Sequence, residues 1–184
     1  MSLWVNAAEL CIAADEFLAH ARHSQLNACR WADAMFTVRP YLETDAETVL
    51  TVWWESWHSI EEGVRHPQAF SDWRSRWVQE IAESQVIAVV EDHDGAVVAF
   101  AAANLQSKEL TQLFVRPDQK RRGIGKLLIG WARTQMPHGF RLSTLKKNQS
   151  SRSFYLHQGF VEGETRVSAV NGMEILDYRW TPTG

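Results

Sequence analysis

The sequence predicts an α/β fold in which a mixed, mostly antiparallel sheet of roughly six to seven strands is flanked by about four helices and preceded by an N-terminal helical arm. Three observations lead to this expectation. Strand-like apolar runs alternate with helix-like segments from residue 35 onward. The pairs Asp94-Gly95 and Asn171-Gly172 are typical of tight turns between antiparallel strands. Residues 113–129, LFVRPDQKRRGIGKLLI, form a strand that passes through glycines into an apolar helix.

Composition indicates a soluble globular protein with one domain and an appendage. The 184 residues are 45% apolar and 22% charged, and no apolar run is long enough to cross a bilayer, so no membrane partner is expected. Glu9, Asp15 and Glu16 interrupt the N-terminal apolar region, which makes it a poor signal peptide. Cys11 and Cys29 provide no disulfide framework. We therefore expect a cytoplasmic protein.

Residues 1–34 are predicted to be a helical extension, and residues 35–184 the main domain. An apolar stripe recurs at steps of four and three, at Leu3, Ala7, Leu10, Ala14, Phe17 and Ala21. Such a stripe must be buried on the domain or on a second copy, so we favour a packed arm or a homodimer over a disordered leader. The spacing of Cys11, His20, His23 and Cys29 fits no familiar zinc site, and we expect no metal.

The remaining elements follow from apolar patterns, caps and turns. We expect strands at residues 36–41, 86–91, 96–104, 109–115, 140–144, 161–170 and 173–180. We expect one helix from an Asp45 cap to about His58 and another from a Ser71 cap to about Glu83. Two more are expected at residues 125–135 and 149–157, the last ended by Gly159.

The glycine turn after the strand at residues 109–115 has the properties of an anion site. Glycines let a ligand approach the backbone, and the first N–H groups of the following helix are unpaired and at the positive end of its dipole. The stretch from Arg116 to Lys126 has a net charge of +4, against −3 for the whole chain. Such a local concentration favours a phosphate or pyrophosphate over a nucleic acid, which needs an extended basic face. The alternative is an ordinary solvated loop before a helix.

Two common phosphate loops are excluded. A Walker loop requires glycine where Lys120 stands, and Ser or Thr where Leu127 stands. The dinucleotide fingerprint requires a small residue at Leu128. We therefore expect neither nucleotide hydrolysis nor NAD binding.

A second motif, residues 148–160, reads NQSSRSFYLHQGF. On a helix, Asn148, Ser151 and Tyr155 share one face, and Gly159-Phe160 forms the exit. Following the glycine turn in this order, the motif resembles the GNAT superfamily of acyl-CoA-dependent N-acetyltransferases. The resemblance covers residues 36–180.

The resemblance implies acetyl-CoA as acyl donor and a role for each matching residue. The turn binds the pyrophosphate, a strand pairs with the pantetheine arm and polarises the thioester, a side chain contacts that arm, and a tyrosine protonates the departing thiolate. The resemblance assigns the pyrophosphate to the turn formed by Lys120, Arg121, Arg122, Gly123, Ile124, Gly125 and Lys126, and the pantetheine arm and thioester to the strand residues Leu113, Phe114 and Val115. The side chain that contacts the arm is Asn148, and the tyrosine is Tyr155. Lys120 replaces the more usual Arg or Gln.

The general base is not identified by the motifs. An aliphatic amine, with a pKa of about 10.4, must lose a proton before it attacks. Some relatives have a glutamate where Ser143 stands, so the base is another group or water. Glu109 is the leading candidate, followed by Glu55, Glu61 and Glu62. The missing glutamate favours an alternative, a GNAT-like sensor or interaction module that binds acyl-CoA without transfer, whereas Tyr155 argues against it.

The resemblance also implies that the segment between the first two strands shapes the acceptor pocket. Its tryptophans, Trp53, Trp54, Trp57, Trp73 and Trp77, are mostly predicted to be core, and a subset suits an aromatic wall for a cation. Residues 41–83 hold nine acidic and three basic side chains, a net charge of −6. This favours an amine acceptor on a small molecule or peptide, unless the charges merely solvate two amphipathic helices.

Overall fold

The computed structural model describes residues 35–60 and 68–182. The predicted arm at residues 1–34, with its apolar stripe, cysteines and expected role in dimerisation, lies outside these residues and stays a prediction. So do Glu61 and Glu62. Within the described part of the chain, no helix combines the length and apolar character that crossing a bilayer requires.

A seven-stranded sheet forms the centre of the domain, in the order β1-β2-β3-β4-β5-β7-β6. Every neighbouring pair is antiparallel except β4 and β5, which are parallel. The predicted mixed, mostly antiparallel sheet is therefore confirmed. The strands are β1 (Phe36–Pro40), β2 (Val86–Asp92), β3 (Val97–Asn104), β4 (Glu109–Val115), β5 (Phe140–Leu145), β6 (Val161–Val167) and β7 (Glu174–Trp180).

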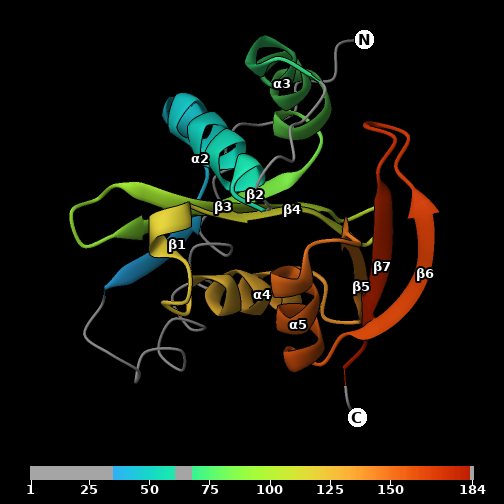
Figure 1. The fold of residues 1–184 in the computed structure, drawn as a ribbon. Coiled ribbons are helices and arrows are strands. Elements are labelled where there is room, and N and C mark those ends of the chain that lie inside the picture. Colours follow the sequence, from blue (N-terminus) through green and yellow to red (C-terminus); the bar gives the residue numbers. More distant parts are fainter. Residues whose placement is uncertain (1–34, 61–67, 183–184) are drawn as a thin grey trace, which may run out of the picture. The chain divides into compact units, whose positions relative to one another are not determined.

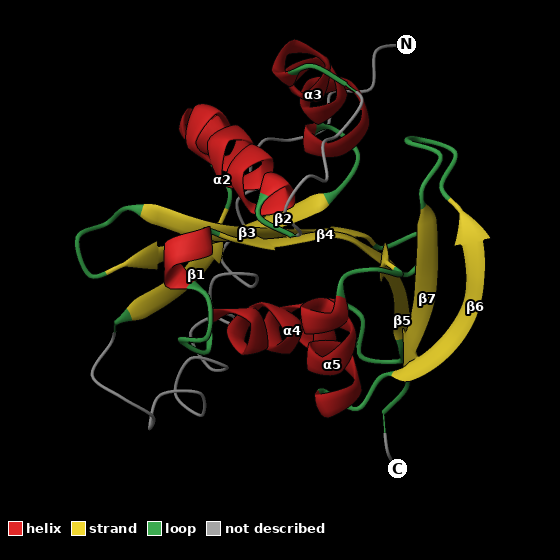
Figure 2. Cartoon of the chain, in the orientation of Figure 1, coloured by secondary structure: helices red, strands yellow, loops and turns green. Residues whose placement is uncertain are grey.

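Helices cover both faces of this sheet (Figure 1). One face is covered by α2 (Ala46–His58) and by α3 (Phe70–Arg76), which continues directly into a π-helical turn, η2 (Trp77–Ala82). The other face is covered by α4 (Ile124–Gln135) and α5 (Gln149–His157). Figure 2 shows the resulting three layers, with the strands between the two groups of helices.

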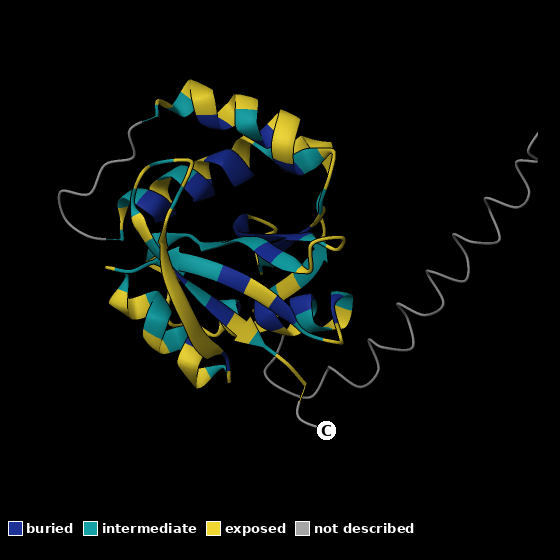
Figure 3. Ribbon diagram, turned by 90° about the vertical axis from the view of Figure 1, so that its right-hand side faces the viewer, coloured by how far each residue is buried: buried dark blue, intermediate teal, exposed yellow. Residues whose placement is uncertain are grey.

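Each face of the sheet has its own apolar core. Beneath α4 and α5 the core includes Leu128, Ile129 and Tyr178, all at most 1% exposed. On the α2 and α3 face it is built on Trp53, Trp57, Trp73 and Trp77, which are 1–7% exposed, and Trp53 and Trp77 pack directly against Phe100 of β3. The prediction that most of these tryptophans are core residues is confirmed. Figure 3 shows the buried residues concentrated between the layers, whereas β6 at the front is exposed along its whole length.

The parallel pair β4 and β5 separates almost as soon as it forms. The two strands pair only at Glu109 and Arg141, next to a hydrogen bond from the Arg141 N–H to the Lys108 carbonyl of 3.0 Å. In Figure 1 strands β1–β4 run across the view, whereas β5, β7 and β6 turn away from them. A bulge at Thr111, where β4 shifts register against β3, adds to the local twist. The edge of β4 beyond Glu109 therefore has no β5 partner.

The position of the first predicted helix cap is confirmed, and that of the second is wrong. Asp45 is the N-cap residue of α2, which ends at His58, but it also ends a 3₁₀ turn, η1 (Glu43–Asp45), and its carboxylate accepts from the Leu42 N–H at 2.8 Å instead of from an N–H of α2. The second helix begins before Ser71, because the Asp72 carboxylate accepts from the Ala69 N–H at 2.9 Å. In both cases an aspartate that reaches back three residues fixes the turn.

The last hairpin also differs from its prediction. Strand β6 ends at Val167 and β7 begins at Glu174, so the connection is longer than a two-residue Asn171-Gly172 turn. The Ser168 N–H donates to the Met173 carbonyl at 2.8 Å, and the Gly172 N–H donates to the Ser168 carbonyl at 2.9 Å. This loop extends beyond the sheet.

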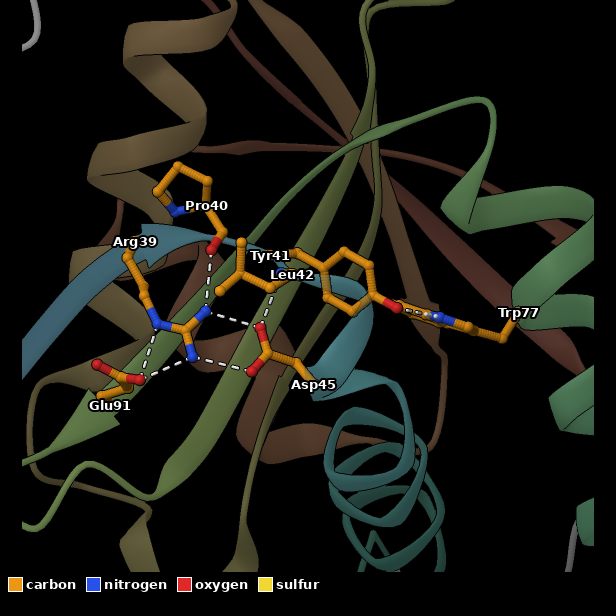
Figure 4. A network of polar contacts seen from close by, with 7 residues as sticks. All are labelled: Arg39, Pro40, Tyr41, Leu42, Asp45, Trp77 and Glu91. Atoms are coloured by element: carbon orange, nitrogen blue, oxygen red, sulfur yellow. Dashed lines mark hydrogen bonds and ion pairs between the residues drawn. The ribbon is translucent and has the colours of Figure 1, made fainter. Parts of the chain in front are cut away.

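An ion-pair network fixes the entry into α2 (Figure 4). The Arg39 guanidinium donates to both Asp45 carboxylate oxygens, at 2.7 and 2.9 Å, and to Glu91 on β2 at 2.7 Å. The side chains of Arg39 and Asp45 are only 24% and 9% exposed. Nearby, the Trp77 indole N–H donates to the Tyr41 hydroxyl at 3.2 Å. The hydrogen bonds from Arg39 hold the pKa of the Asp45 carboxyl below its ordinary value.

We predict that Asp45→Asn lowers the free energy of unfolding at neutral pH by about 1–3 kcal/mol, because it removes charge-assisted hydrogen bonds from a largely buried pair. A carboxyl whose folded-state pKa is depressed stabilises the protein above its unfolded-state pKa, near 3.9, and loses that contribution as pH falls through the folded value. The difference between wild type and variant, measured by urea denaturation, should therefore be largest above about pH 4 and shrink in more acidic solution.

Glu47→Gln is the matched control, since it breaks the pair with Arg74, in which both side chains are more than half exposed. It should change the unfolding free energy by less than about 0.5 kcal/mol. Equal losses in the two variants would contradict the special role of Asp45.

Candidate active site

A cavity of about 710 Å³ lies where β4 and β5 diverge. Its walls come from α2 and α3 on one face of the sheet and from α4 and α5 on the other, so it passes through the gap between the two strands. Residues from β4, β5, the β4–α4 loop and the β6–β7 loop complete it. One cavity, partly open to solvent, is thus in contact with both predicted motifs.

The glycine turn has a backbone suited to an anion. Arg121 and Gly123 both adopt left-handed conformations, with φ of 63° and 87°. Gly123 is the N-cap of α4, and no side chain caps the first turn of that helix. Alternating backbone conformations of this kind turn successive N–H groups toward one concavity, which favours an anion. The pyrophosphate site expected at this turn stays a prediction.

Gly125 is required for a different reason. A Cβ atom at this position would lie 3.1 Å from Cζ of the Phe154 ring on α5. The absent side chain therefore allows α4 and α5 to approach each other. The two motifs are in direct contact here.

Three of the predicted cations reach the cavity, namely Lys120, Arg121 and Lys126. The Lys120 ammonium donates to the Ser59 hydroxyl after α2 at 2.8 Å, and burial lowers the pKa of Lys120 below its ordinary value. Arg122 lies over the Phe36 ring, 4.9 Å from its centroid, and is not part of the cavity wall.

Arg116 is also outside the wall, because it pairs with Asp118 at 2.7 Å. The net charge of residues 116–126 is therefore larger than the positive charge that this stretch contributes to the cavity wall.

Leu113, Phe114 and Val115 line the middle of the cavity. The Arg116 N–H donates to the Val98 carbonyl of β3 at 2.8 Å. Backbone groups alternate in direction along a strand, so the N–H groups of Leu113 and Val115 point away from β3, toward the edge that β5 leaves open. The Ser56 hydroxyl on α2 donates to the Val115 carbonyl at 2.8 Å and fixes this end of the strand.

Asn148 is the N-cap of α5 and also lines the cavity. Its side-chain oxygen accepts from the Ser151 N–H at 3.1 Å. The Asn148 NH₂ group is left for an acceptor in the cavity.

Tyr155 lies in the wall, with 7% of its surface exposed. Its ring packs against Phe160 and Tyr178, with centroids 5.6 Å away in each case. Burial raises the pKa of the Tyr155 phenol above its ordinary value, so the hydroxyl is protonated at neutral pH. Among the described residues no side chain or backbone group hydrogen-bonds to this hydroxyl, which leaves it available to a ligand.

The structure does not bring Glu109 to the cavity. Its carboxylate pairs with Arg141 at 3.1 Å, at the end of β4 where the two strands still touch. Glu55 is outside the wall as well, and no residue of the described wall is a carboxylate or a histidine. The proposal that Glu109 is the base therefore has no geometric support.

The end of the cavity near α2 and α3 is aromatic and cationic. Trp53, Trp57 and Trp73 form its wall together with Arg76, whose guanidinium carbon lies 5.5 Å from the Trp53 ring centroid. None of the described acidic residues of segment 41–83 lines the cavity. Several of them form ion pairs or turns instead, which favours the interpretation that these charges solvate and cap the helices.

Sequence reasoning missed several residues of this wall. Ser56 on α2 and Ser59, the residue that follows this helix, stand three residues apart. This spacing could have indicated a polar stripe facing the cavity. Arg76 and the β6–β7 loop residues Ser168, Val170 and Asn171 carried no recognisable signal, because only the tertiary fold brings them here.

Known proteins share the sequence pattern and the fold. A family model described as an acetyltransferase (GNAT) domain matches residues 58–182. Peptidyl-lysine N-acetyltransferase YiaC from Escherichia coli is 37% identical over 71 residues, which make up 39% of this chain and 47% of that protein. The match thus spans about half the length of this curated relative.

Two solved structures illustrate the similarity in fold. A GCN5-related N-acetyltransferase from Rhodopseudomonas palustris has a TM-score of 0.67 at 18% identity, covering 83% of this chain and 99% of its own. PaiA N-acetyltransferase from Thermoplasma acidophilum, in complex with coenzyme A, has a TM-score of 0.59 at 20% identity, covering 79% and 99%. At these identities the likeness shows the fold alone.

We predict opposite effects for two glycine substitutions near the turn. Gly123→Ala should lower the free energy of unfolding by about 1–2 kcal/mol, because a Cβ atom is strained at a left-handed φ. Gly130→Ala, within α4 where a Cβ atom has nothing within 4 Å, should raise it by about 0.5–1 kcal/mol. Urea denaturation of both variants is the measurement, and equal signs would contradict the left-handed assignment.

Proposed function

Because the chain belongs to the GNAT acetyltransferase family, we propose that it transfers an acetyl group from acetyl-CoA directly to a primary amine of a small molecule or peptide. One observation carries this proposal. A single cavity runs from an uncapped helix N-terminus, past an unpaired strand edge, to a buried and protonated phenol. The lysine acetyltransferase among its relatives supports an amine acceptor.

The cofactor would bind along the α4 and α5 side. The turn from Lys120 to Lys126 would hold the diphosphate through backbone N–H groups, aided by the cations of the wall. The pantetheine amides would pair with the open edge of β4 in place of β5, and the Asn148 NH₂ group would donate to one of their carbonyls.

The chemistry would follow from what surrounds the thioester. The neutral amine would attack the carbonyl carbon, and the N–H groups of Leu113 and Val115 would stabilise the negative charge that develops on the carbonyl oxygen. As the C–S bond breaks, Tyr155 donates its proton to the departing thiolate, and the tyrosinate regains a proton from the nitrogen of the new amide or from water. Since the described wall contains no carboxylate, the incoming ammonium would lose its first proton to water.

The lack of a carboxylate or histidine in the described wall also favours the second candidate, an acyl-CoA sensor that holds the cofactor without transferring the acyl group. Release of free CoA thiol from acetyl-CoA, measured with a panel of amines, separates the two. Amine-dependent release supports transfer. Tight binding of acetyl-CoA without release with any amine would overturn the enzymatic proposal.

We predict that Tyr155→Phe lowers kcat by about 10²–10⁴-fold, because it removes the proton donor, yet keeps the ring packing against Phe160 and Tyr178. The dissociation constant for acetyl-CoA, measured by calorimetry, should hardly change. Equal losses in turnover and in cofactor affinity would remove the role of Tyr155 as the acid.

A second prediction concerns the charge at the turn. Lys126→Gln should weaken CoA binding at low ionic strength by about ten-fold, since one charge-assisted contact with the diphosphate is lost. The difference from wild type should shrink as salt is added. Arg116→Gln is the matched control, because it removes the same charge from an arginine that pairs with Asp118 outside the wall. Equal weakening by both variants would show that only the general positive potential matters.

A further inference from the structure

We propose that the acceptor carries a carboxylate or similar oxyanion close to its amine, and that Arg76 binds this group. The inference rests on the proposed function, because it concerns the acceptor end of the same cavity. It narrows the acceptor from amines in general to amino acids and comparable amino-oxyanions.

Arg76 is held in a conformation that leaves its outer nitrogens unused. It is the last residue of α3, and its side chain is only 20% exposed. The Nε–H donates to a Glu80 carboxylate oxygen at 3.0 Å, one helical turn further on, while the guanidinium lies over the Trp53 ring. Among the described residues, nothing hydrogen-bonds to the two terminal NH₂ groups. A planar guanidinium fixed in this way presents a fork that suits a carboxylate.

The surroundings increase the attraction for an anion. Arg76 shares its end of the cavity with Trp53, Trp57 and Trp73, which are nearly fully buried and exclude water. The described wall contains no carboxylate, and among the described residues the carboxylate that pairs with Arg76 is that of Glu80, whose side chain is 57% exposed and which accepts from Nε. Since no described residue of this wall is a carboxylate, a polyamine or a lysine side chain would bring a second cation close to Arg76, which is unfavourable.

The position of Arg76 separates it from the cofactor site. The cations assigned to the diphosphate, Lys120, Arg121 and Lys126, belong to the loop before α4 and the first turn of that helix. Arg76 belongs to α3, in the helical layer on the opposite face of the sheet (Figure 1). The thioester would lie between these two groups, beside Leu113–Val115 and Tyr155. An acceptor anchored at Arg76 by its oxyanion would therefore present its amine toward the middle of the cavity.

The test compares acceptors that differ only in the carboxylate. Phenylalanine, leucine and glutamate are compared with phenethylamine, isoamylamine and 4-aminobutyrate, respectively, each of which lacks the carboxylate next to the amine. Phenylalaninamide is a further control, because it has a polar but uncharged carboxamide in place of the carboxylate. For the side chain that fits, kcat/KM from thiol release should favour the α-carboxylate by about 10–100-fold. Arg76→Gln should abolish this preference, mainly by raising the KM for the amino-acid acceptor. The KM for acetyl-CoA should be unchanged.

Control variants separate charge from geometry. Arg74→Gln removes another arginine from α3, one whose side chain is 55% exposed and pairs with Glu47, and should keep the preference. Arg76→Lys keeps the charge without the fork and should retain only part of it. Equal or better use of spermidine, or of a lysine peptide lacking a nearby oxyanion, together with no effect of Arg76→Gln, would overturn the inference.

Failure of the inference differs from failure of the proposed function. Thiol release without a carboxylate preference leaves the transferase intact and removes the assignment of Arg76. If acetyl-CoA binds but no amine releases thiol, the same pairs are compared by calorimetric binding to the CoA-loaded protein. Tighter binding of the amino acids that depends on Arg76 would then support the anion site. Absence of any such difference, in turnover and in binding, would overturn it.

Discussion

The separation of β4 from β5 is the structural constraint on which the rest of the site depends. A parallel pair that continued in register would bury the backbone groups of Leu113 and Val115 in ladder hydrogen bonds. Because pairing stops after Glu109 and Arg141, those groups remain unpaired with β5 at the centre of the domain. The antiparallel ladders on either side keep the two halves of the sheet intact while the gap stays open.

The two apolar cores make this gap tolerable. The tryptophans on the α2 and α3 face and the aliphatic residues beneath α4 and α5 bury the sheet from both sides, so the missing β4–β5 hydrogen bonds are offset elsewhere. Each layer also delivers different chemistry to the cavity. The α4 and α5 layer supplies the glycine turn, proposed to bind the diphosphate, and the Tyr155 phenol, whereas the described part of the α2 and α3 layer supplies an aromatic wall with Arg76.

Local patterns in the sequence were sufficient for most of the fold and for the two motifs. The strand at Glu109–Val115 and the helix at Gln149–His157 were predicted to the residue, because apolar periodicity and turn residues act over short distances. Contacts between distant residues were not predictable in this way. The Ser56 hydroxyl meets the Val115 carbonyl 59 positions away, and Arg76 of α3 joins the wall by lying over the Trp53 ring of α2. Glu109 was favoured from its position on the cofactor strand, but the sequence does not reveal that Arg141 binds its carboxylate.

The contact between Gly125 and Phe154 restricts which amino-acid substitutions are tolerated at position 125. Phe154 is the neighbour of Tyr155 on α5, and their rings pack with centroids 5.3 Å apart. Any side chain introduced at Gly125 would push on the Phe154 ring and, through it, on Tyr155. The turn proposed to bind the cofactor and the proposed proton donor are thus connected through one ring, so a substitution at Gly125 is expected to affect both.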